Sequence, residues 1–201
     1  MKKIIFSIFI TSGLLFGGCA TNTAVKEQIQ KKAVEQAAAF EGMKDGTTID
    51  GFSVLTIRAT MKTPIEGFYP LESKSALHGK PEYPFVFNIG GQGVVWLAKG
   101  LPDKQTESID GKKNPEGGQG IKYTLEKRIM LKPGDYKIYV GLTEENLQKE
   151  FDVTIFEGKT RVLLFMPLYF TGRYTRNTGS FYRGLRDFEV YLSGKKIEPV
   201  N

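Results

Sequence analysis

The sequence predicts an all-β fold, an antiparallel β-sandwich, preceded by a signal peptide and one short helix. Three observations lead to this prediction. The first residues form an apolar export signal, the next stretch repeats apolar residues at helical spacing, and the chain after Gly46 alternates apolar and polar residues. Alternation with period two is typical of strands that bury one face, and turn residues between such runs are typical of an antiparallel sandwich.

The first residues have the composition of a secretory signal peptide. Lys2 and Lys3 precede an apolar stretch over residues 4–16, and small residues at 17–18 lead to Cys19. A charged start, a short apolar region and small residues at a cleavage point define such a signal. The apolar stretch is shorter than the roughly 20 residues that a membrane-spanning helix needs, so we predict cleavage rather than retention.

Leu15-Phe16-Gly17-Gly18-Cys19 resembles the lipobox of bacterial lipoproteins. The resemblance implies that a diacylglyceryl group is attached to the Cys19 sulfur, that residues 1–18 are removed, and that the new amine is acylated, for example with palmitate. The family usually has Leu at the position that Phe16 occupies here. An ordinary signal peptide with an incidental cysteine is the alternative. Cys19 is the only cysteine, which excludes an intramolecular disulfide and leaves the thiol available for lipid.

Charge and the residue after the cysteine suggest a location in the cell envelope. Lys and Arg number 28 against 22 Asp and Glu, an excess that suits anionic headgroups or acidic glycans and is too diffuse for nucleic acid. Lipoproteins kept in the inner membrane often have Asp after the cysteine, whereas this chain has Ala20. The resemblance therefore implies an outer-membrane anchor on the periplasmic face, with an envelope protein complex or an acidic glycan or lipid as the expected partner.

Residues 19–46 form the predicted tether and an amphipathic helix. Between Thr23 and Phe40 the composition is rich in Ala, Gln, Lys and Glu, and apolar residues recur at helical spacing up to Gly42. The apolar stripe is thin and mostly alanine, which favours a spacer or a loosely packed helix. A helix that pairs with a partner is the alternative.

Residues 47–201 form the predicted sandwich domain. The runs that alternate or are continuously apolar lie at 55–61, 85–89, 94–97, 136–142, 151–155, 162–166 and 188–192. Residues 162–166 are apolar on both faces, which is typical of a central strand. Turn residues at 133–135, 157–159 and 193–194 separate the later runs.

The segment Leu131-Lys132-Pro133-Gly134-Asp135-Tyr136-Lys137-Ile138-Tyr139-Val140 resembles a hairpin of PEGA-type, transthyretin-like and immunoglobulin-like domains of bacterial surface proteins. The resemblance covers about residues 121–165 and implies a fold class without functional residues. Residues 99–120 are polar and glycine-rich, and we predict a mobile loop there. A boundary between two small β units is the alternative for this segment.

The sequence contains no recognisable catalytic or metal-binding motif, and we predict no enzymatic activity and no cofactor. His78 is the only histidine and is predicted to be a surface loop residue. A metal site needs several clustered ligands, and a histidine base needs a nucleophile and an orienting partner. Glu144 and Glu145 are predicted to lie solvated in a turn.

Arginine and aromatic residues concentrate between Tyr169 and Arg186. Arginine binds carboxylate and phosphate through a planar fork, and aromatic faces stack on sugars and cations. We predict a projecting hairpin that binds an acidic glycan, a lipid headgroup or a partner protein. Solvated arginines on a hairpin whose aromatics cover the core are the alternative. The candidate binding residues are Arg173, Tyr174, Arg176, Tyr182, Arg183 and Arg186.

Together these features predict a lipid-anchored envelope protein that acts as a non-enzymatic binding or scaffolding module. One alternative is a binding module for envelope polysaccharide or anionic lipid that uses the arginine and aromatic hairpin. Another is an envelope hydrolase acting on glycan or lipid, which would need two carboxylates across a cleft.

Overall fold

The computed structural model describes residues 50–171 and 179–200. Cys19 and the predicted helix between Thr23 and Phe40 lie outside these residues. The described elements, in chain order, are β1 (Ser53–Thr63), β2 (Glu82–Ile89), β3 (Gln92–Gln105), β4 (Ser108–Ile109), β5 (Lys112–Lys113), β6 (Gly118–Leu131), β7 (Gly134–Leu142), β8 (Leu147–Ile155), β9 (Thr160–Tyr169), the 3₁₀ helix η1 (Ser180–Arg183), β10 (Leu185–Leu192) and β11 (Lys195–Ile197).

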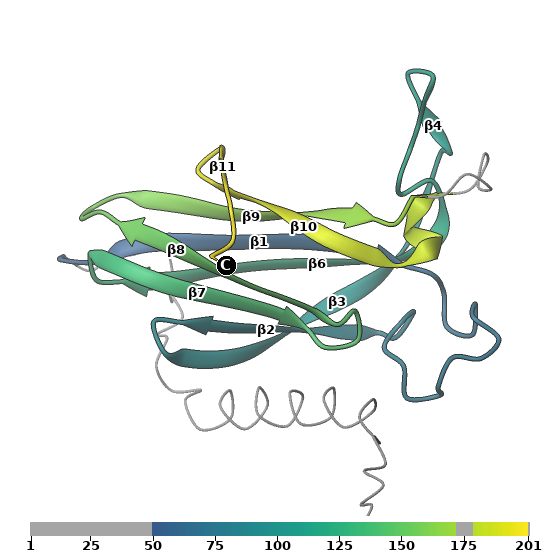
Figure 1. The fold of residues 1–201 in the computed structure, drawn as a ribbon, viewed down its shortest axis with the longest axis horizontal. Coiled ribbons are helices and arrows are strands. Elements are labelled where there is room, and N and C mark those ends of the chain that lie inside the picture. Colours follow the sequence, from purple (N-terminus) through teal and green to yellow (C-terminus); the bar gives the residue numbers. More distant parts are fainter. Residues whose placement is uncertain (1–49, 172–178, 201) are drawn as a thin grey trace, which may run out of the picture.

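The described strands confirm the all-β class, and nine of them form one mixed sheet (Figure 1). Their order is β11-β10-β9-β1-β6-β3-β2-β7-β8, and β4 pairs with β5 as a separate hairpin. Neighbouring strands in the sheet are antiparallel except β1 and β9, which run parallel. A sandwich of two separately hydrogen-bonded sheets is not confirmed, because hydrogen bonds connect all nine strands.

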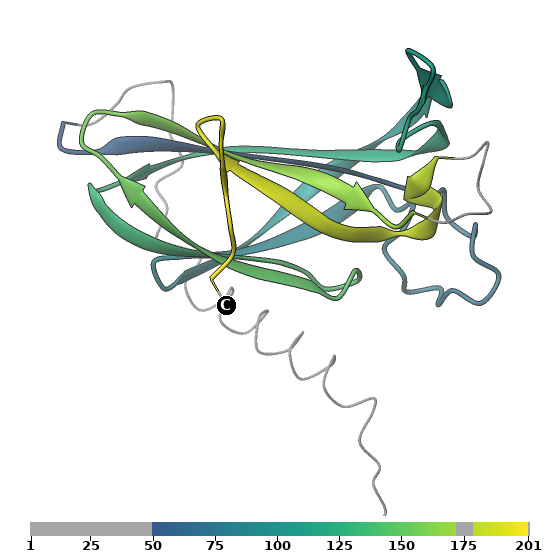
Figure 2. The same ribbon diagram turned by 45° about the horizontal axis from the view of Figure 1, so that its top comes forward.

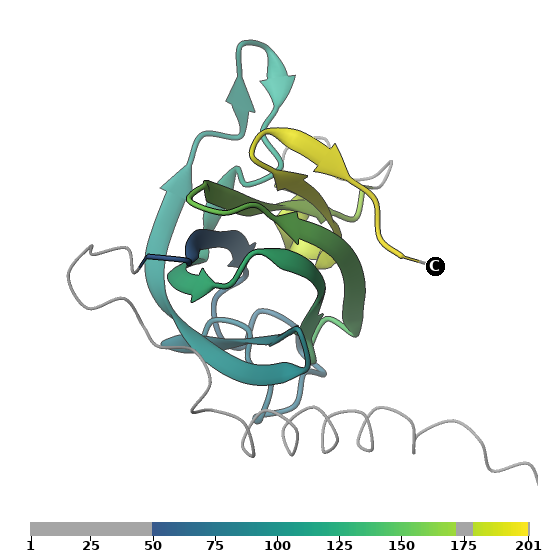
Figure 3. The ribbon, with the colours of Figure 1, turned by 90° about the vertical axis from the view of Figure 1, so that its left-hand side faces the viewer.

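The sheet curls until it is nearly barrel-shaped, and its two edges come together (Figures 2 and 3). Residues that follow β11 reach the β8 edge, where the Val200 amide donates to the Glu150 carbonyl at 2.8 Å. Lys149 on β8 forms an ion pair with Asp187 on β10 at 2.7 Å. These contacts hold the curled sheet closed along one side.

Alternating apolar residues of the strands fill the interior of the curled sheet. Phe165 on β9 is fully buried and its ring contacts Phe87, Phe151 and Phe188, at centroid distances of 5.7, 6.2 and 5.9 Å. These rings come from β2, β8 and β10, which lie on different sides of the interior. Burying an aromatic side chain contributes a few kcal/mol, so this cluster is a main source of stability.

The prediction of a loop over residues 99–120 is wrong for most of its length. β3 continues to Gln105, β6 begins at Gly118, and the β4–β5 hairpin lies between them. β3 pairs with β2 up to Lys99 and with β6 from there onward, so its polar second half is hydrogen-bonded on the β6 side. Backbone pairing explains why a segment with little apolar alternation is still a strand.

Candidate functional site

Three segments meet at one end of the curled sheet, which we call the loop end. They are residues 64–81 between β1 and β2, residues 106–117 that include the β4–β5 hairpin, and residues 179–184 around η1 (Figure 1). Two networks of charged residues tie these segments to the sheet. The networks are centred on Lys62 and on His78.

Lys62 lies at the end of β1 and its side chain has no exposed surface. Its neighbours Met61 and Ala59 alternate toward the core, so Lys62 points to the outer face of the strand. The segments 106–117 and 179–184 cover that face, and the Lys62 ammonium lies 4.7 Å from the centre of the Phe181 ring. Burial of a lysine requires that its three donors find acceptors.

The Lys62 ammonium has three acceptors within hydrogen-bonding distance. It donates to Asp103 Oδ2 at 2.7 Å and to the carbonyl oxygens of Glu116 and Gly118 at 2.8 Å each. Partial burial raises the pKa of Asp103, but the hydrogen bonds from Lys62 and Gln105 and the nearby lysine charges outweigh it and hold that pKa below its usual value. The charge of Lys62 is therefore fully compensated within the fold.

Glu116 extends this network to β6 and β9. One of its oxygens accepts from Lys122 Nζ at 2.7 Å, and the other accepts from the Tyr169 hydroxyl at 3.0 Å. The same hydroxyl accepts the backbone N–H of Lys62 at 2.8 Å. Burial and the charge of Glu116 raise the pKa of Tyr169 far above its usual value, so this hydroxyl stays protonated.

Gly120 on β6 gives the Lys62 side chain its space. A Cβ atom at this position would lie 2.5 Å from the Thr63 carbonyl oxygen, 2.8 Å from the Phe181 ring and 2.9 Å from Lys62 Cε. No side chain fits at such distances without moving the backbone of β1. Glycine is therefore required for the close approach of β6, β1 and η1.

His78 is the centre of the second network and lies between two glutamates. Its Nδ1 hydrogen-bonds to Glu72, in the same loop, and its Nε2 lies 2.9 Å from Glu145 Oε1, in the β7–β8 turn. The Tyr83 hydroxyl also donates to Glu145 Oε1, at 3.0 Å. Only 15% of the His78 side chain and 6% of the Glu145 side chain are exposed. The predictions of a surface histidine and a solvated Glu145 are therefore wrong, because the loop folds back onto the turn.

The His78 imidazole is charged at neutral pH. Burial lowers its pKa, but the hydrogen bonds and charges of Glu145 and Glu72 outweigh burial and raise the pKa of His78 to about 9. Burial and the same two carboxylates raise the pKa of Tyr69, whose ring contacts His78, to about 12. The imidazolium between two carboxylates therefore clamps residues 64–81 to the β7–β8 turn.

Both networks are built for position rather than for proton transfer. Each His78 nitrogen has a carboxylate partner, and each Lys62 donor has an acceptor. The recess between them is too narrow to hold a water molecule. A general base needs a free lone pair within reach of a substrate, and neither His78 nor Lys62 offers one.

The clamped segments carry apolar side chains that face solvent. Leu71 is 99% exposed, and four further apolar residues at this end are about half exposed. Large apolar side chains that face solvent are candidates for contact with a partner. The five residues are Ile65, Phe68, Leu71, Ile109 and Phe170.

The candidate residues of the arginine and aromatic segment have different outcomes. Arg173, Tyr174 and Arg176 lie outside the described residues. Arg183, on η1, and Arg186, on β10, are exposed at the loop end.

Tyr182 is part of the packing between the segments of the loop end. Its ring contacts Phe68 and Phe181, with centroid distances of 4.9 and 4.0 Å, and its hydroxyl donates to the Gln119 carbonyl at 2.7 Å. Tyr182 therefore has a structural role in the described part of the chain.

Sequence reasoning missed Lys62, Asp103 and Glu116. Each is one charged residue in a polar neighbourhood, and a side chain buried by distant segments leaves no periodic signal. For Tyr169 and Phe181, the aromatic enrichment marked the right region but indicated an exposed surface, whereas both side chains are buried.

Residues 50–171 and 179–200 contain no group of three or more His, Cys, Asp or Glu side chains that could hold a metal ion. In the same part of the chain, no helix has the length and apolar character needed to cross a membrane. No protein-family model, no curated protein and no solved structure matches this chain.

Proposed function

We propose that this chain is a lipid-anchored protein of the bacterial cell envelope that binds or scaffolds a partner without catalysing a reaction. The anchor is lipid on Cys19, attached after removal of residues 1–18, and the proposed location is the periplasmic face of the outer membrane. The export signal and the cysteine at its end support this part of the proposal. The resemblance of residues 121–165 to immunoglobulin-like and transthyretin-like domains of bacterial surface proteins is part of the same proposal.

One observation carries the binding role: the His78 network fixes residues 64–81, and three large apolar side chains of this segment face solvent. Rigid presentation lowers the entropy lost when a partner binds. Lys62 and His78, whose donors are paired inside the fold, suit this task. The proposed contact surface consists of Ile65, Phe68 and Leu71.

A second candidate is binding of an acidic glycan or anionic lipid at the same end. The exposed side chains of Arg183 and Arg186 favour it, because guanidinium groups pair with carboxylates and phosphates. Binding of this kind would weaken steeply as salt rises. The sequence also left a hydrolase as an alternative, and no contact among the described residues favours it.

The first experiment compares the wild-type chain with Cys19→Ser by intact mass and membrane fractionation. We expect a lipid-sized mass gain on wild type alone, with the variant released from membranes. If both proteins are soluble and equally processed, the anchor is wrong.

The second experiment places a photo-crosslinking amino acid at Leu71 in cells. The matched control carries it at Thr124, an exposed position on β6 away from the loops. We expect one discrete crosslinked product from Leu71 and none from Thr124. Equal products from both positions would contradict a binding surface at the loop end.

A further inference from the structure

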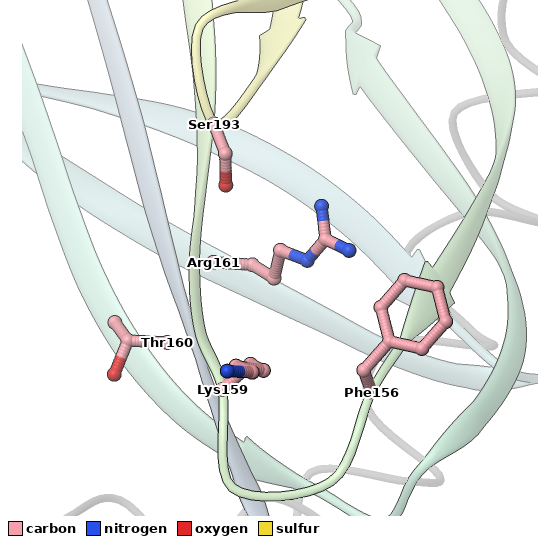
Figure 4. A pocket seen from close by; sticks show the side chains of 5 residues that line it. All are labelled: Phe156, Lys159, Thr160, Arg161 and Ser193. Carbon is pink, nitrogen blue, oxygen red and sulfur yellow. The ribbon is translucent and has the colours of Figure 1, made fainter.

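A shallow pocket lies at the end of the curled sheet opposite the loop end, where the β8–β9 and β10–β11 turns meet (Figure 4). It has a volume of about 300 Å³, and it is lined by Phe156, Lys159, Thr160, Arg161 and Ser193. The Ser193 amide donates to the Val162 carbonyl at 2.7 Å and so ties the β10–β11 turn to β9, the strand that follows the β8–β9 turn. The pocket is thus formed by backbone-fixed turns rather than by free loops.

Arg161 is held in place by an aromatic ring. Its guanidinium carbon lies 4.8 Å from the centre of the Phe156 ring. Stacking uses the face of the guanidinium and leaves the N–H groups at its edge free to donate in their plane. In the described parts of the chain, neither Arg161 nor Lys159 has a carboxylate partner, in contrast to the fully paired Lys62.

Ser193 adds a hydroxyl donor beside the guanidinium (Figure 4). Its oxygen accepts the Val162 amide at 3.4 Å, so its own hydrogen stays available to a ligand. Ser193 and Gly194 have φ values of 49° and 86°, as required in a two-residue hairpin turn. Glycine or asparagine would fit this turn with less strain than serine, so the hydroxyl has a cost that a ligand would explain.

We propose that this pocket binds a phosphate group, with the Arg161 guanidinium, the Lys159 ammonium and the Ser193 hydroxyl as its donors. A carboxylate presents two oxygens in one plane, and the arginine fork alone would pair with it. Three donors from the β8–β9 turn, strand β9 and the β10–β11 turn suit a tetrahedral anion that accepts from several directions, and two cations without a carboxylate partner among the described residues match its charge. The volume admits the phosphate and the first atoms of whatever carries it.

The pocket lies beside the start of β1. Ser53, the first residue of β1, donates to the carbonyl of Phe156. The first strand of the sheet therefore begins beside the pocket, and on the proposed lipid anchor at Cys19 a lipid headgroup is one source of the phosphate. The other source is free phosphate. The binding site itself does not depend on lipidation, and its test uses unlipidated protein.

The test uses the full chain with Cys19→Ser and two probes. The probes are inorganic phosphate, followed by calorimetry, and vesicles of phosphatidylcholine with or without phosphatidylglycerol, followed by sedimentation. Vesicles of phosphatidylcholine alone measure any binding that comes from the apolar residues 4–16. The site variant is Lys159→Gln with Arg161→Gln. The matched control is Lys99→Gln with Arg128→Gln, which removes the same two charges from exposed positions on β3 and β6.

We expect the site variant to weaken binding at least tenfold and the control to bind as the parent does. If the parent binds inorganic phosphate and the site variant does not, phosphate alone is sufficient as a ligand. If the variant differs from the parent only in binding to vesicles with phosphatidylglycerol, the ligand is a lipid headgroup. Ser193→Gly keeps the turn and should weaken binding several-fold with an unchanged thermal transition. Equal weakening in site variant and control, or no binding of either probe by the parent, would overturn the proposal. None of these outcomes depends on whether Cys19 carries lipid.

Discussion

Lys62 shows how one buried charge fixes the position of several segments. Its ammonium bonds to Asp103, Glu116 and Gly118, so replacing it with an apolar group leaves acceptors buried without partners. Breaking a buried ion pair typically costs about 3 kcal/mol or more. We expect Lys62→Met to lower the free energy of unfolding by about 3 kcal/mol in urea titrations at pH 7.

The control for this prediction lies on the same strand. Arg58 pairs with Glu126 across β1 and β6, but both side chains are half exposed. Exposed pairs contribute less than about 1 kcal/mol. We therefore expect Arg58→Met to change the free energy of unfolding by less than that amount. A loss equal to that of Lys62→Met would contradict the prediction, because it would mean that burial of Lys62 adds nothing to the strength of its interactions.

The His78 clamp predicts a fall in stability at mildly alkaline pH. The pKa of His78 is about 9 in the folded protein and near the ordinary 6.5 in the unfolded chain. Below pH 6.5 both states hold the proton and the full contribution is present. As pH rises from 6.5 to 9, unfolding releases a proton, so up to about 3 kcal/mol of stability is lost.

The measurement is the free energy of unfolding at several pH values for wild type and His78→Gln. His78 is the only histidine, so the variant should show a nearly flat profile in this range. The raised pKa of Tyr69 affects the free energy of unfolding only above pH 10. The lowered pKa values of Asp103 and Glu189 affect it only at acid pH. Parallel profiles for the two proteins would show that the clamp is not charged in the folded state.

At this scale the sequence predicts little of the candidate site. A single histidine in a loop is more often exposed than clamped, and only the folded chain brings Glu145 to it from the β7–β8 turn. Lys62 is buried because segments far away in sequence cover the outer face of β1. Contacts of this kind have no local pattern from which they could be predicted.

Among the elements, β1 and the β4–β5 hairpin are expected to differ most in local stability. β1 is hydrogen-bonded on both sides, to β6 and to β9, and lies in the middle of the sheet. β4 and β5 have two residues each and pair only with one another. We expect amide hydrogens of residues 55–61 to exchange orders of magnitude more slowly than those of residues 108–113. Similar protection of residues 55–61 and 108–113 would contradict this prediction, because it would mean that the hairpin has stabilising contacts besides those among the described residues.

Strands with alternating apolar residues were predictable, and those with interrupted alternation were not. The runs at 136–142, 151–155 and 188–192 coincide with β7, β8 and β10. β6 was not predicted as a strand, although Tyr123, Leu125, Ile129 and Leu131 alternate toward the core, because Lys127 interrupts the pattern. The second half of β3 is polar and exists because β6 pairs with it.

At the scale of the whole molecule, one continuous sheet implies one unfolding unit. Trp96 on β3 is the only tryptophan and its ring lies 5.2 Å from that of Phe87. Its fluorescence therefore reports on the core, while far-ultraviolet circular dichroism reports on all strands. We expect the two signals to give the same urea midpoint. Separate midpoints would mean that residues before and after β4–β5 unfold as two units.

The fold class could be predicted from the sequence, but the topology could not. Period-two alternation reports that a strand has a buried face and carries no information on its neighbours. The parallel pairing of β1 with β9 and the contact of residues after β11 with β8 join segments far apart in the chain. A sandwich and a curled sheet present the same alternation, so only the hydrogen bonds distinguish them.

The parallel pair also sets the order of events when the protein is made. Val54 in β1 pairs with Thr160 in β9, so one side of β1 stays open until that part of the chain has been synthesised. At the usual pace of translation the delay is on the order of 10 s. During that time a long apolar strand with an unpaired edge is exposed to other nascent chains. A chaperone that holds such edges, or export before folding, would protect the molecule over this interval.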